Sequence, residues 1–286
     1  MTLRQRLTAP DILIAPGVYD GLTAALATDA GFEALYLSGA AVAYTRLGRP
    51  DIGLSTASEM TDTMALIADR TDLPVIMDAD TGFGNAMNAR RTMQSYERAG
   101  ASALQVEDQT YPKKCGHLSD KSLIPKEEMA GKIAAMADAR RHDTLIIART
   151  DAIAVEGFDA AIDRAGSYID AGADVLFIEA PRDSGELSRI ADTFKGRVPL
   201  LANMVEGGAT PISSATTLED MGFDIVIFPG GIVRALAKSA QDYYASLKET
   251  GSNKAFSDRM HDFDGLNAAI GTPEMLALGK RFDGKS

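Results

Sequence analysis

Short apolar runs rich in β-branched residues recur along the 286-residue chain, and they constrain its fold more than any other feature. They occupy residues 12–17, 34–39, 74–80, 103–108, 144–150, 175–180, 199–204 and 225–230. Nearly continuous apolar runs of this length are typical of strands that are buried on both faces of a parallel sheet. We therefore predict eight parallel strands.

Segments with helical spacing lie between these runs, at residues 19–30, 58–70, 85–99, 126–141, 158–171, 185–194 and 232–250. Several helix-to-strand junctions repeat in sequence, and each contains a glycine suited to ending a helix: Gly31, Gly100, Gly172 and Gly222. Eight strands alternating with helices favour an α/β fold of the closed (β/α)₈ TIM-barrel type. An open doubly wound sheet usually carries a G-x-G-x-x-G turn, which this sequence lacks. Because no Pro- or Ser-rich linker divides it, we predict a single domain over 1–286, with 251–286 as a C-terminal helical extension.

The net charge of −11 leaves no basic stripe for nucleic acid and disfavours binding to anionic membranes. An anionic substrate must therefore be attracted by a local group of Lys and Arg or by a metal. The N-terminus lacks the apolar run of a secretory signal, and no apolar stretch is long enough to span a bilayer. We expect a cytoplasmic enzyme with a small-molecule substrate.

Polar and mostly acidic residues end many of the predicted strands, where the active site of a barrel forms. Converging carboxylates repel each other unless a cation neutralises them, and oxygen ligands suit Mg²⁺, with Mn²⁺ as a substitute. The alternative is that these acids cap helices or pair with lysines. The strand-end residues are Asp78, Asp80, Glu107, Asp108, Arg149, Asp151, Glu179 and Asn203.

The loop QTYPKKCGHLSDKSLIP, residues 109–125, is too long and too charged for a simple connection and is suited to a lid. It contains the only cysteine, Cys115, which therefore cannot form an internal disulfide. Lys113, Lys114 and His117 surround it, and nearby positive charge favours the reactive thiolate. A solvated basic loop that holds an incidental thiol is the alternative interpretation.

These motifs resemble those of the isocitrate lyase and phosphoenolpyruvate mutase superfamily across essentially the whole chain. KKCGH at 113–117 is similar to the K-[KR]-C-G-H signature of the lyase branch. YLSG at 36–39, DADTGFGN at 78–85, VEDQ at 106–109, ARTDA at 148–152 and ANM at 202–204 match further blocks in order. The resemblance implies a Mg²⁺ that holds a 2-oxo or 2-hydroxy carboxylate. It also implies a last helix exchanged between subunits, commonly in homotetramers.

The resemblance further implies roles for individual residues. The implied metal shell is Asp51, Asp78, Asp80 and Glu107. The implied substrate-binding residues are Tyr36, Ser38, Gly39, Ala40, Lys113, Gly116, Asn203 and Pro229, with Ala40 where family members often have a second glycine. The implied catalytic residues are Cys115, Lys114, His117, Arg149 and Glu179.

The implied activity is that of a carbon–carbon lyase, an oxo-acid lyase, acting on a 2-hydroxy dicarboxylate of the substituted malate or 2-methylisocitrate type. Its products would be a 2-oxoacid such as pyruvate and a second carboxylate, with Cys115 protonating the enediolate. An oxaloacetate hydrolase that makes oxalate and acetate is the first alternative. A phosphonomutase fits less well, because that branch generally lacks the KKCGH-like signature. A silent metabolite-binding barrel is the alternative that is not an enzyme.

Three departures from the family pattern leave the substrate open. Asp262-Phe263-Asp264-Gly265-Leu266 stands where methylisocitrate lyases typically have a T-R-E-E-L-like segment with an arginine. MVEGGATP at 204–211 looks closer to dimethylmalate lyase and oxaloacetate hydrolase-like enzymes. Gly230-Gly231 replaces a larger residue and a hydroxyl, which predicts a wider or more mobile pocket.

Overall fold

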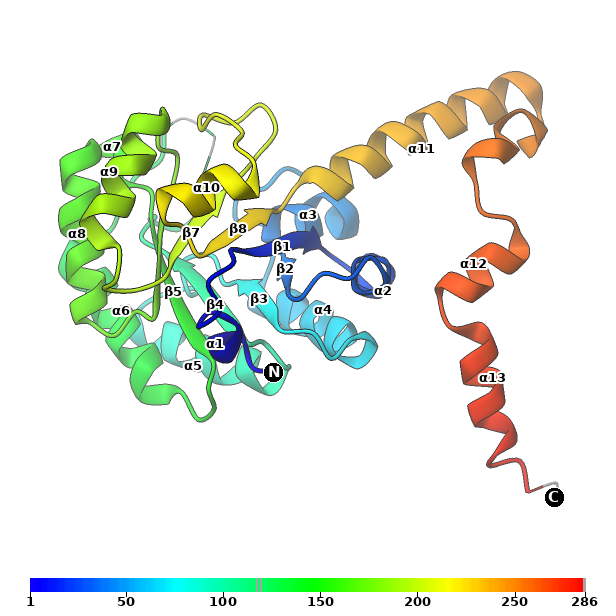
Figure 1. Cartoon of the computed structure of the whole chain (residues 1–286), viewed down its shortest axis with the longest axis horizontal. Helices are drawn as coiled ribbons and strands as arrows, with labels where there is room; N and C mark the ends of the chain where they lie inside the picture. The colour runs from blue at the N-terminus through cyan, green and yellow to red at the C-terminus, as the bar shows by residue number, and fades with distance from the viewer. Residues whose placement is uncertain (117, 119, 285–286) are drawn as a thin grey trace. The chain divides into compact units, whose positions relative to one another are not determined.

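The computed structural model of the protein describes residues 1–116, 118 and 120–284. Within them, eight parallel strands pair in sequence order and close into a barrel, because β8 also pairs with β1 (Figure 1). The predicted (β/α)₈ barrel is confirmed, and each strand lies within two residues of its predicted position. The strands are β1 (Leu13–Val18), β2 (Leu35–Leu37), β3 (Val75–Asp78), β4 (Ala103–Glu107), β5 (Leu145–Thr150), β6 (Val175–Ile178), β7 (Leu200–Asn203) and β8 (Ile225–Phe228).

Helices connect the strands and follow the predicted segments closely. The longer ones are α2 (Gly21–Asp29), α4 (Ala57–Arg70), α5 (Ala86–Arg98), α6 (Lys126–Ala139), α8 (Phe158–Asp170), α9 (Ser184–Phe194) and α11 (Gly231–Thr250). The shorter ones include α1 (Leu3–Arg6), α3 (Gly39–Val42), a π-helix η1 (Ala43–Leu47), α7 (Ala152–Val155) and α10 (Ala215–Met221). Apolar periodicity did not predict α10, because its sequence, ATTLEDM, is short and contains few large apolar residues.

The junction glycines adopt the conformation that their positions predicted. Gly31, Gly100, Gly172 and Gly222 have φ angles of 85°, 104°, 107° and 103°. Side chains with a Cβ rarely adopt this region, so glycine ends these helices at low cost and lets the chain turn into the next strand.

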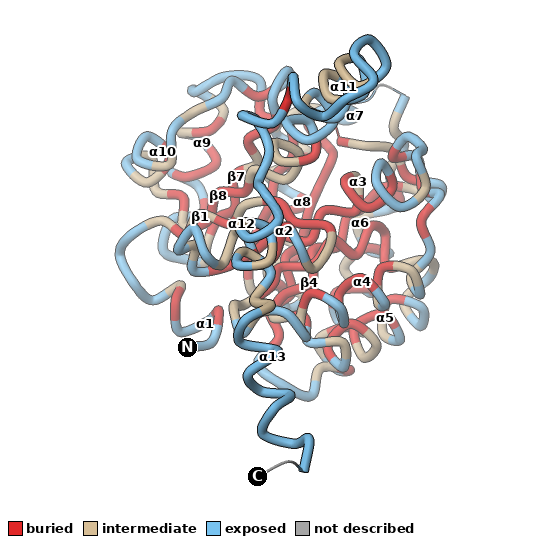
Figure 2. The backbone as a smooth tube through the Cα atoms, turned by 90° about the vertical axis from the view of Figure 1, so that its right-hand side faces the viewer, coloured by how far each residue is buried: buried red, intermediate tan, exposed pale blue. Residues whose placement is uncertain are grey.

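Apolar side chains from the strands fill the barrel interior, and the strands lie in the buried centre of the molecule (Figure 2). Leu3 of α1 joins this cluster, which also includes Leu13, Tyr36, Ile76, Phe177 and Ile227. A packed interior leaves no channel through the barrel, so chemistry is confined to its ends.

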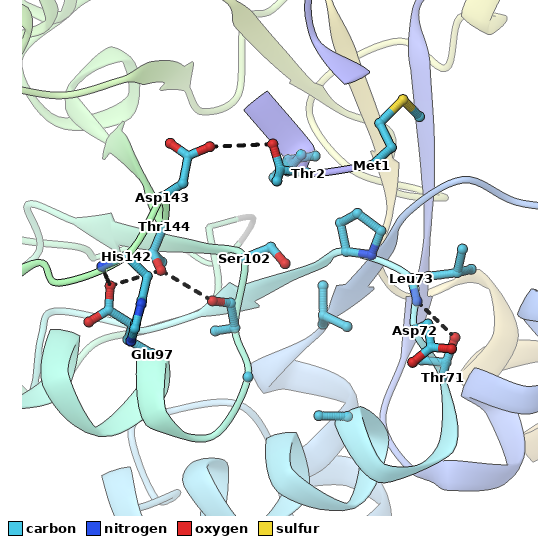
Figure 3. A pocket seen from close by; sticks show the side chains of 16 residues that line it. Met1, Thr2, Thr71, Asp72, Leu73, Glu97, Ser102, His142, Asp143 and Thr144 are labelled. Atoms are coloured by element: carbon cyan, nitrogen blue, oxygen red, sulfur yellow. Dashed lines mark hydrogen bonds between the residues drawn. The ribbon is translucent and has the colours of Figure 1, made fainter. Parts of the chain in front are cut away.

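At the N-terminal end of the barrel, hydrogen bonds join Glu97 of α5 to the segment before β5, beside a surface pocket (Figure 3). The Glu97 carboxylate accepts hydrogen bonds from the His142 amide at 2.9 Å and from the Thr144 hydroxyl at 3.0 Å. It also accepts one from the Arg141 amide at 3.1 Å. These contacts satisfy the backbone just before β5, so they stabilise this end of the barrel.

The chain divides into two compact units, residues 1–231 and 232–286. The second contains most of α11, a 3₁₀ helix η2 (Asn253–Arg259), α12 (Phe263–Ala269) and α13 (Thr272–Lys280). Within it the Tyr243 and Phe256 rings lie 5.5 Å apart, edge to face. Among the described residues, no helix combines the length and apolar character needed to cross a membrane.

Gly17 of β1 permits a close approach to the segment after β8. A Cβ at this position would lie 2.2 Å from the Pro229 carbonyl oxygen. We therefore expect Gly17→Ala to lower the free energy of unfolding, measured by chemical denaturation, by roughly 1–3 kcal/mol, the usual cost of overpacking. Gly131→Ala on α6 is the control, because no atom lies within 4 Å of its added Cβ. That variant should be about 0.5–1 kcal/mol more stable than the wild type. Equal stability of Gly17→Ala and wild type would contradict the tight β1–β8 contact.

Candidate active site

The polar residues that the sequence singled out gather at the C-terminal ends of the strands. Asp78 ends β3, Glu107 ends β4 and Asn203 ends β7, while Arg149 is the second-to-last residue of β5 and Glu179 follows β6. All except the half-buried Asn203 are buried. Because the active site of a barrel forms at this end, the fold brings these candidate residues to one place.

Lys113 lies among the predicted metal-binding carboxylates. Its Nζ is 2.6 Å from Asp51 Oδ1 and 2.7 Å from Asp80 Oδ1. The contact with Asp80 is an ion pair whose geometry does not meet that of a hydrogen bond. Burial would lower the pKa of Lys113, but Asp80 and Asp51 hold it well above its usual value. Burial raises the pKa of Asp80 to about 6, although Lys113 opposes the shift. The lysine therefore balances part of the buried negative charge.

Asp78 is oriented by hydrogen bonds from three sides. Its carboxylate accepts from the Gly39 amide at 3.3 Å, the Asp80 amide at 3.1 Å and Gln105 Nε2 at 3.3 Å. The Tyr36 hydroxyl donates to Gln105 Oε1 at 2.5 Å. Tyr36, predicted to bind substrate, thus contacts Asp78 through Gln105.

Sequence reasoning missed Gln105, although a signal was present. Gln105 and Glu107 are two residues apart on β4, so their side chains point to the same face of the strand. A glutamine inside an apolar run, facing the same way as a strand-end carboxylate, indicates a polar contact inside the barrel. Gln105 is fully buried.

The donor set fits a hard divalent cation. Within the described part of the chain, no three His, Cys, Asp or Glu side chains form a ready-made metal cluster. However, Glu107 Oε1 is a buried carboxylate oxygen with no hydrogen-bond partner among the described residues. Burial holds the pKa of Glu107 well above its usual value, despite the opposing charge of Arg149. A buried carboxylate oxygen without a hydrogen-bond partner is a suitable ligand for Mg²⁺.

Arg149 is the central cation of the site. Its Nε lies 2.9 Å from Asp151 Oδ2 and its Nη2 lies 3.1 Å from Asp151 Oδ1, a bidentate pair. The guanidinium is also 3.3 Å from a carboxylate oxygen of Glu107 and 3.3 Å from one of Glu179. Its position is further defined by the Phe177 ring, whose centroid lies 5.1 Å from Cζ.

Asp151 is kept ionised in the interior. Burial by itself would raise its pKa, but the cations of Arg149 and Lys121 lower the pKa of Asp151 to about 2. Lys121 Nζ lies 2.7 Å from Asp151 Oδ1. Asp151 was a strand-end candidate without an assigned role. Lys121 was not predicted, because it follows Cys115 by six positions in a loop without periodicity.

Glu179 and Asn203 form the other side of the site. Asn203 Nδ2 donates to Glu179 Oε2 at 3.1 Å, while Glu179 Oε1 accepts from the Ala180 amide at 2.8 Å. Asn203 Oδ1 is buried without a hydrogen-bond partner among the described residues. Glu179 therefore contacts both Asn203 and Arg149.

The loop after β4 is fastened on both sides of Cys115. The Cys115 amide donates to the Asp51 carbonyl at 3.1 Å. The Gln109 side chain donates to the Lys114 carbonyl at 2.9 Å and accepts from the Lys114 amide at 3.0 Å. Lys114 Nζ donates to the Asp120 carbonyl at 2.8 Å. His117 lies outside the described residues.

Gly116 packs directly onto the buried ion pair. A Cβ added to it would lie 2.3 Å from Arg149 Nη2 and 2.8 Å from Glu179 Oε2. Only a glycine leaves room for the backbone beside Cys115 to come this close to the two side chains. The thiol-bearing loop and the Arg149 site are therefore one structural unit.

The remaining candidates follow the ends of β2 and β8. The Ser38 hydroxyl accepts from the Ala41 amide at 3.2 Å and caps α3, whose first turn contains Gly39 and Ala40. Pro229, Gly230 and Gly231 follow β8 and are half-buried. A Cβ at Gly231 would lie 3.1 Å from Glu206 Oε1, so the second glycine makes room for that carboxylate.

Asp151→Asn tests the charge balance of this site. It keeps the side-chain shape but removes the carboxylate between two buried cations. We expect the free energy of unfolding to fall by about 3–5 kcal/mol, the usual effect of breaking a buried ion pair. The control is Asp163→Asn, whose solvent-exposed pair with Lys126 contributes little to stability. If both variants lose equally little stability in chemical denaturation, the buried pair does not hold the site together.

Comparison with known proteins places this arrangement in a family. The family model described as phosphoenolpyruvate phosphomutase matches residues 3–248. The chain is 42% identical over 270 residues to 2,3-dimethylmalate lyase of Eubacterium barkeri, covering 94% of this chain and 93% of that protein. It is 47% identical over 261 residues to 2-methylisocitrate lyase of Aeropyrum pernix, covering 91% and 83%.

Two solved structures of related proteins match this chain over essentially its whole length. Oxaloacetate acetylhydrolase in complex with 3,3-difluorooxalacetate matches with a TM-score of 0.94 and 32% identity, covering 100% of this chain and 97% of that one. Phosphonopyruvate hydrolase in complex with oxalate and Mg²⁺ matches with a TM-score of 0.89 and 31% identity, covering 99% of both chains. With these matches and the site geometry together, the chain belongs to the phosphoenolpyruvate mutase/isocitrate lyase superfamily.

Proposed function

We propose that this protein is a Mg²⁺-dependent carbon–carbon lyase that cleaves a 2-hydroxy dicarboxylate into a 2-oxoacid and a second carboxylate. The observation that carries the proposal is the contact of Gly116 with the Arg149–Glu179 pair, which joins the Cys115 loop to the acidic site. The two sequence relatives described above are named as lyases of 2,3-dimethylmalate and 2-methylisocitrate. A substituted malate is the substrate class that this site suits.

The proposed metal ligands are Asp51, Asp78, Asp80 and Glu107, directly or through water. When bound, Mg²⁺ would supply Lewis-acid polarisation of the substrate's hydroxyl and neighbouring carboxylate. The unpartnered Glu107 oxygen and the oriented Asp78 carboxylate support this assignment. A structural relative in complex with oxalate and Mg²⁺ supports it independently.

The proposed reaction is a retro-Claisen cleavage. A base takes the proton of the substrate hydroxyl, the carbon–carbon bond beside it breaks, and a 2-oxoacid carbonyl forms. The electron pair of that bond passes to the departing carboxylate as an enediolate, which the fixed guanidinium of Arg149 stabilises. The Cys115 thiol then donates its proton to the enediolate carbon and completes the second product. Asn203 would bind a substrate oxygen, and Glu179 would hold Arg149 and Asn203 in place.

Cys115→Ser tests the proton donor. The hydroxyl of serine is a much weaker acid than a thiol, so we expect turnover of the best substrate to fall by about 10²–10⁴-fold. Mg²⁺-dependent binding of oxalate, measured by calorimetry, should survive as the control for an intact site. Near-normal turnover by this variant would remove the thiol from the mechanism.

Removal of divalent metal tests the acidic cluster. We expect EDTA to abolish cleavage, and added Mg²⁺ or Mn²⁺ to restore it, because the proposed ion would hold the hydroxyl and carboxylate of the substrate. Cleavage rates before chelation, after it and after restoration are the measurement. Activity that persists at full rate in metal-free buffer would contradict a metal-dependent reaction.

Oxaloacetate hydrolysis is the second candidate, and one observation favours it. The match to oxaloacetate acetylhydrolase extends over the whole of this chain. In that reaction water attacks the 2-oxo carbon, and the departing enediolate takes the same proton from Cys115. A screen of substituted malates, 2-methylisocitrate and oxaloacetate separates the two, since oxalate with acetate indicates hydrolysis and a 2-oxoacid with a monocarboxylate indicates cleavage by the lyase.

The proposal extends to assembly and location. We propose a cytoplasmic homotetramer in which residues 251–286 form a helical extension exchanged between subunits. Large apolar side chains in that segment support a contact with another subunit: Phe263 is 83% exposed, Met275 69% and Phe282 76%. Such side chains are usually covered by a partner when several occur close together.

A further inference from the structure

The ammonium group of Lys121 is buried at the base of the Cys115 loop. Its side chain is only 2% exposed, and Nζ lies 2.7 Å from Asp151 Oδ1, on a residue with no exposed side-chain surface. Nζ also donates a short hydrogen bond to the Gly116 carbonyl oxygen. Lysine is almost never fully buried unless it is paired, so these two acceptors define where the side chain is held.

Asp151 is fixed to the barrel independently of Lys121. Its amide donates to Asp108 Oδ1 at 3.0 Å, and the Thr150 hydroxyl donates to Asp108 Oδ2 at 2.7 Å. Both carboxylate oxygens of Asp151 also contact Arg149. Asp151 is therefore a rigid acceptor shared by a cation from the barrel and a cation from the loop.

The Lys121–Gly116 hydrogen bond anchors the loop at the residue after the thiol. The contacts on its N-terminal side come from Gln109, which holds the Lys114 backbone, and from the Asp51 carbonyl, which holds the Cys115 amide. None of these earlier contacts reaches Arg149. The Lys121 ammonium is connected to Arg149 through the Asp151 carboxylate.

We propose that Lys121 is a positioning residue that latches the Cys115 loop to Arg149 through Asp151. With its ammonium in place, the Gly116 backbone rests against the guanidinium, and the thiol and the cation keep a fixed spacing. Without it, Gly116 loses its connection to Asp151, and Asp151 keeps a single cationic partner. The consequence for catalysis rests on the proposed function, whereas the latch itself is a property of the loop.

The closing experiment measures how fast iodoacetamide alkylates Cys115, which is the only thiol in the chain. Lys121→Met keeps the length of the side chain but removes its donors. We expect alkylation about tenfold faster than in the wild type, since charged hydrogen bonds shift equilibria by about this factor or more. Loss of the nearby positive charge would by itself slow alkylation, so an acceleration reports opening of the loop.

Lys126→Met is the matched control. Lys126 begins α6, five residues further along, and its partner Asp163 is 68% exposed. That variant should be alkylated at the wild-type rate and should turn over substrate normally. Lys121→Gln, which retains a donor but not the charge, should lie between Lys121→Met and the wild type. If a thermal unfolding scan shows that Lys121→Met is not folded, the alkylation rate of Lys121→Gln tests the proposal instead.

Steady-state kinetics separate positioning from simple structural support. Because the latch sets the spacing of Cys115 and Arg149, Lys121→Met should lower kcat about tenfold or more while KM changes little. Alkylation requires no substrate, so failure of the lyase proposal leaves the latch test intact. Folded Lys121→Met and Lys121→Gln proteins with wild-type alkylation rates would overturn the latch. A loss confined to KM would overturn its positioning role.

Discussion

The buried guanidinium of Arg149 is the interaction on which the rest of the site depends. It balances the carboxylates of Asp151, Glu107 and Glu179 in a region from which water is largely excluded. Buried charges are costly unless they are paired and hydrogen-bonded. A planar group with five donors can satisfy several carboxylates at once, which an ammonium cannot do with the same geometry. The positions of Asn203 and of the Cys115 loop follow from this arrangement.

The barrel tolerates this concentration of charge because its stability comes mainly from the apolar interior, whereas the charged residues lie at the C-terminal ends of the strands. Its interior is packed with apolar side chains, and the contacts of Glu97 hold the backbone before β5. The C-terminal ends of the strands then hold acidic residues on rigid backbone, with loops free to differ among relatives. Gly230 precedes α11 and Gly231 begins it, so specificity is expected to vary at this junction without a change in the core.

The pattern of apolar residues along the chain predicted most strands and helices, because each kind of element has a fixed period of side-chain direction. The eight apolar runs placed every strand, and repeated glycines placed four helix ends. Strand ends in a barrel converge by geometry, which brought Asp78, Glu107 and Arg149 to one site before any contact was known. The helix α10 was missed because its apolar spacing is too sparse to show a period.

By itself the sequence determined the closed barrel, the acidic site and the thiol-bearing loop, since each depends on residue type and spacing along the chain. Only the tertiary structure decided that Lys113 lies between Asp51 and Asp80, that Tyr36 contacts Asp78 through Gln105, and that Lys121 joins the loop to Asp151. For Lys113 and Lys121 the physical reason is that loops have no periodicity to reveal the direction of a side chain. For Tyr36 and Gln105 the strand period gives the face of the sheet, but it does not give the partner on another strand. The partner of a buried charge is instead chosen by desolvation and proximity, which exist only after the chain has folded.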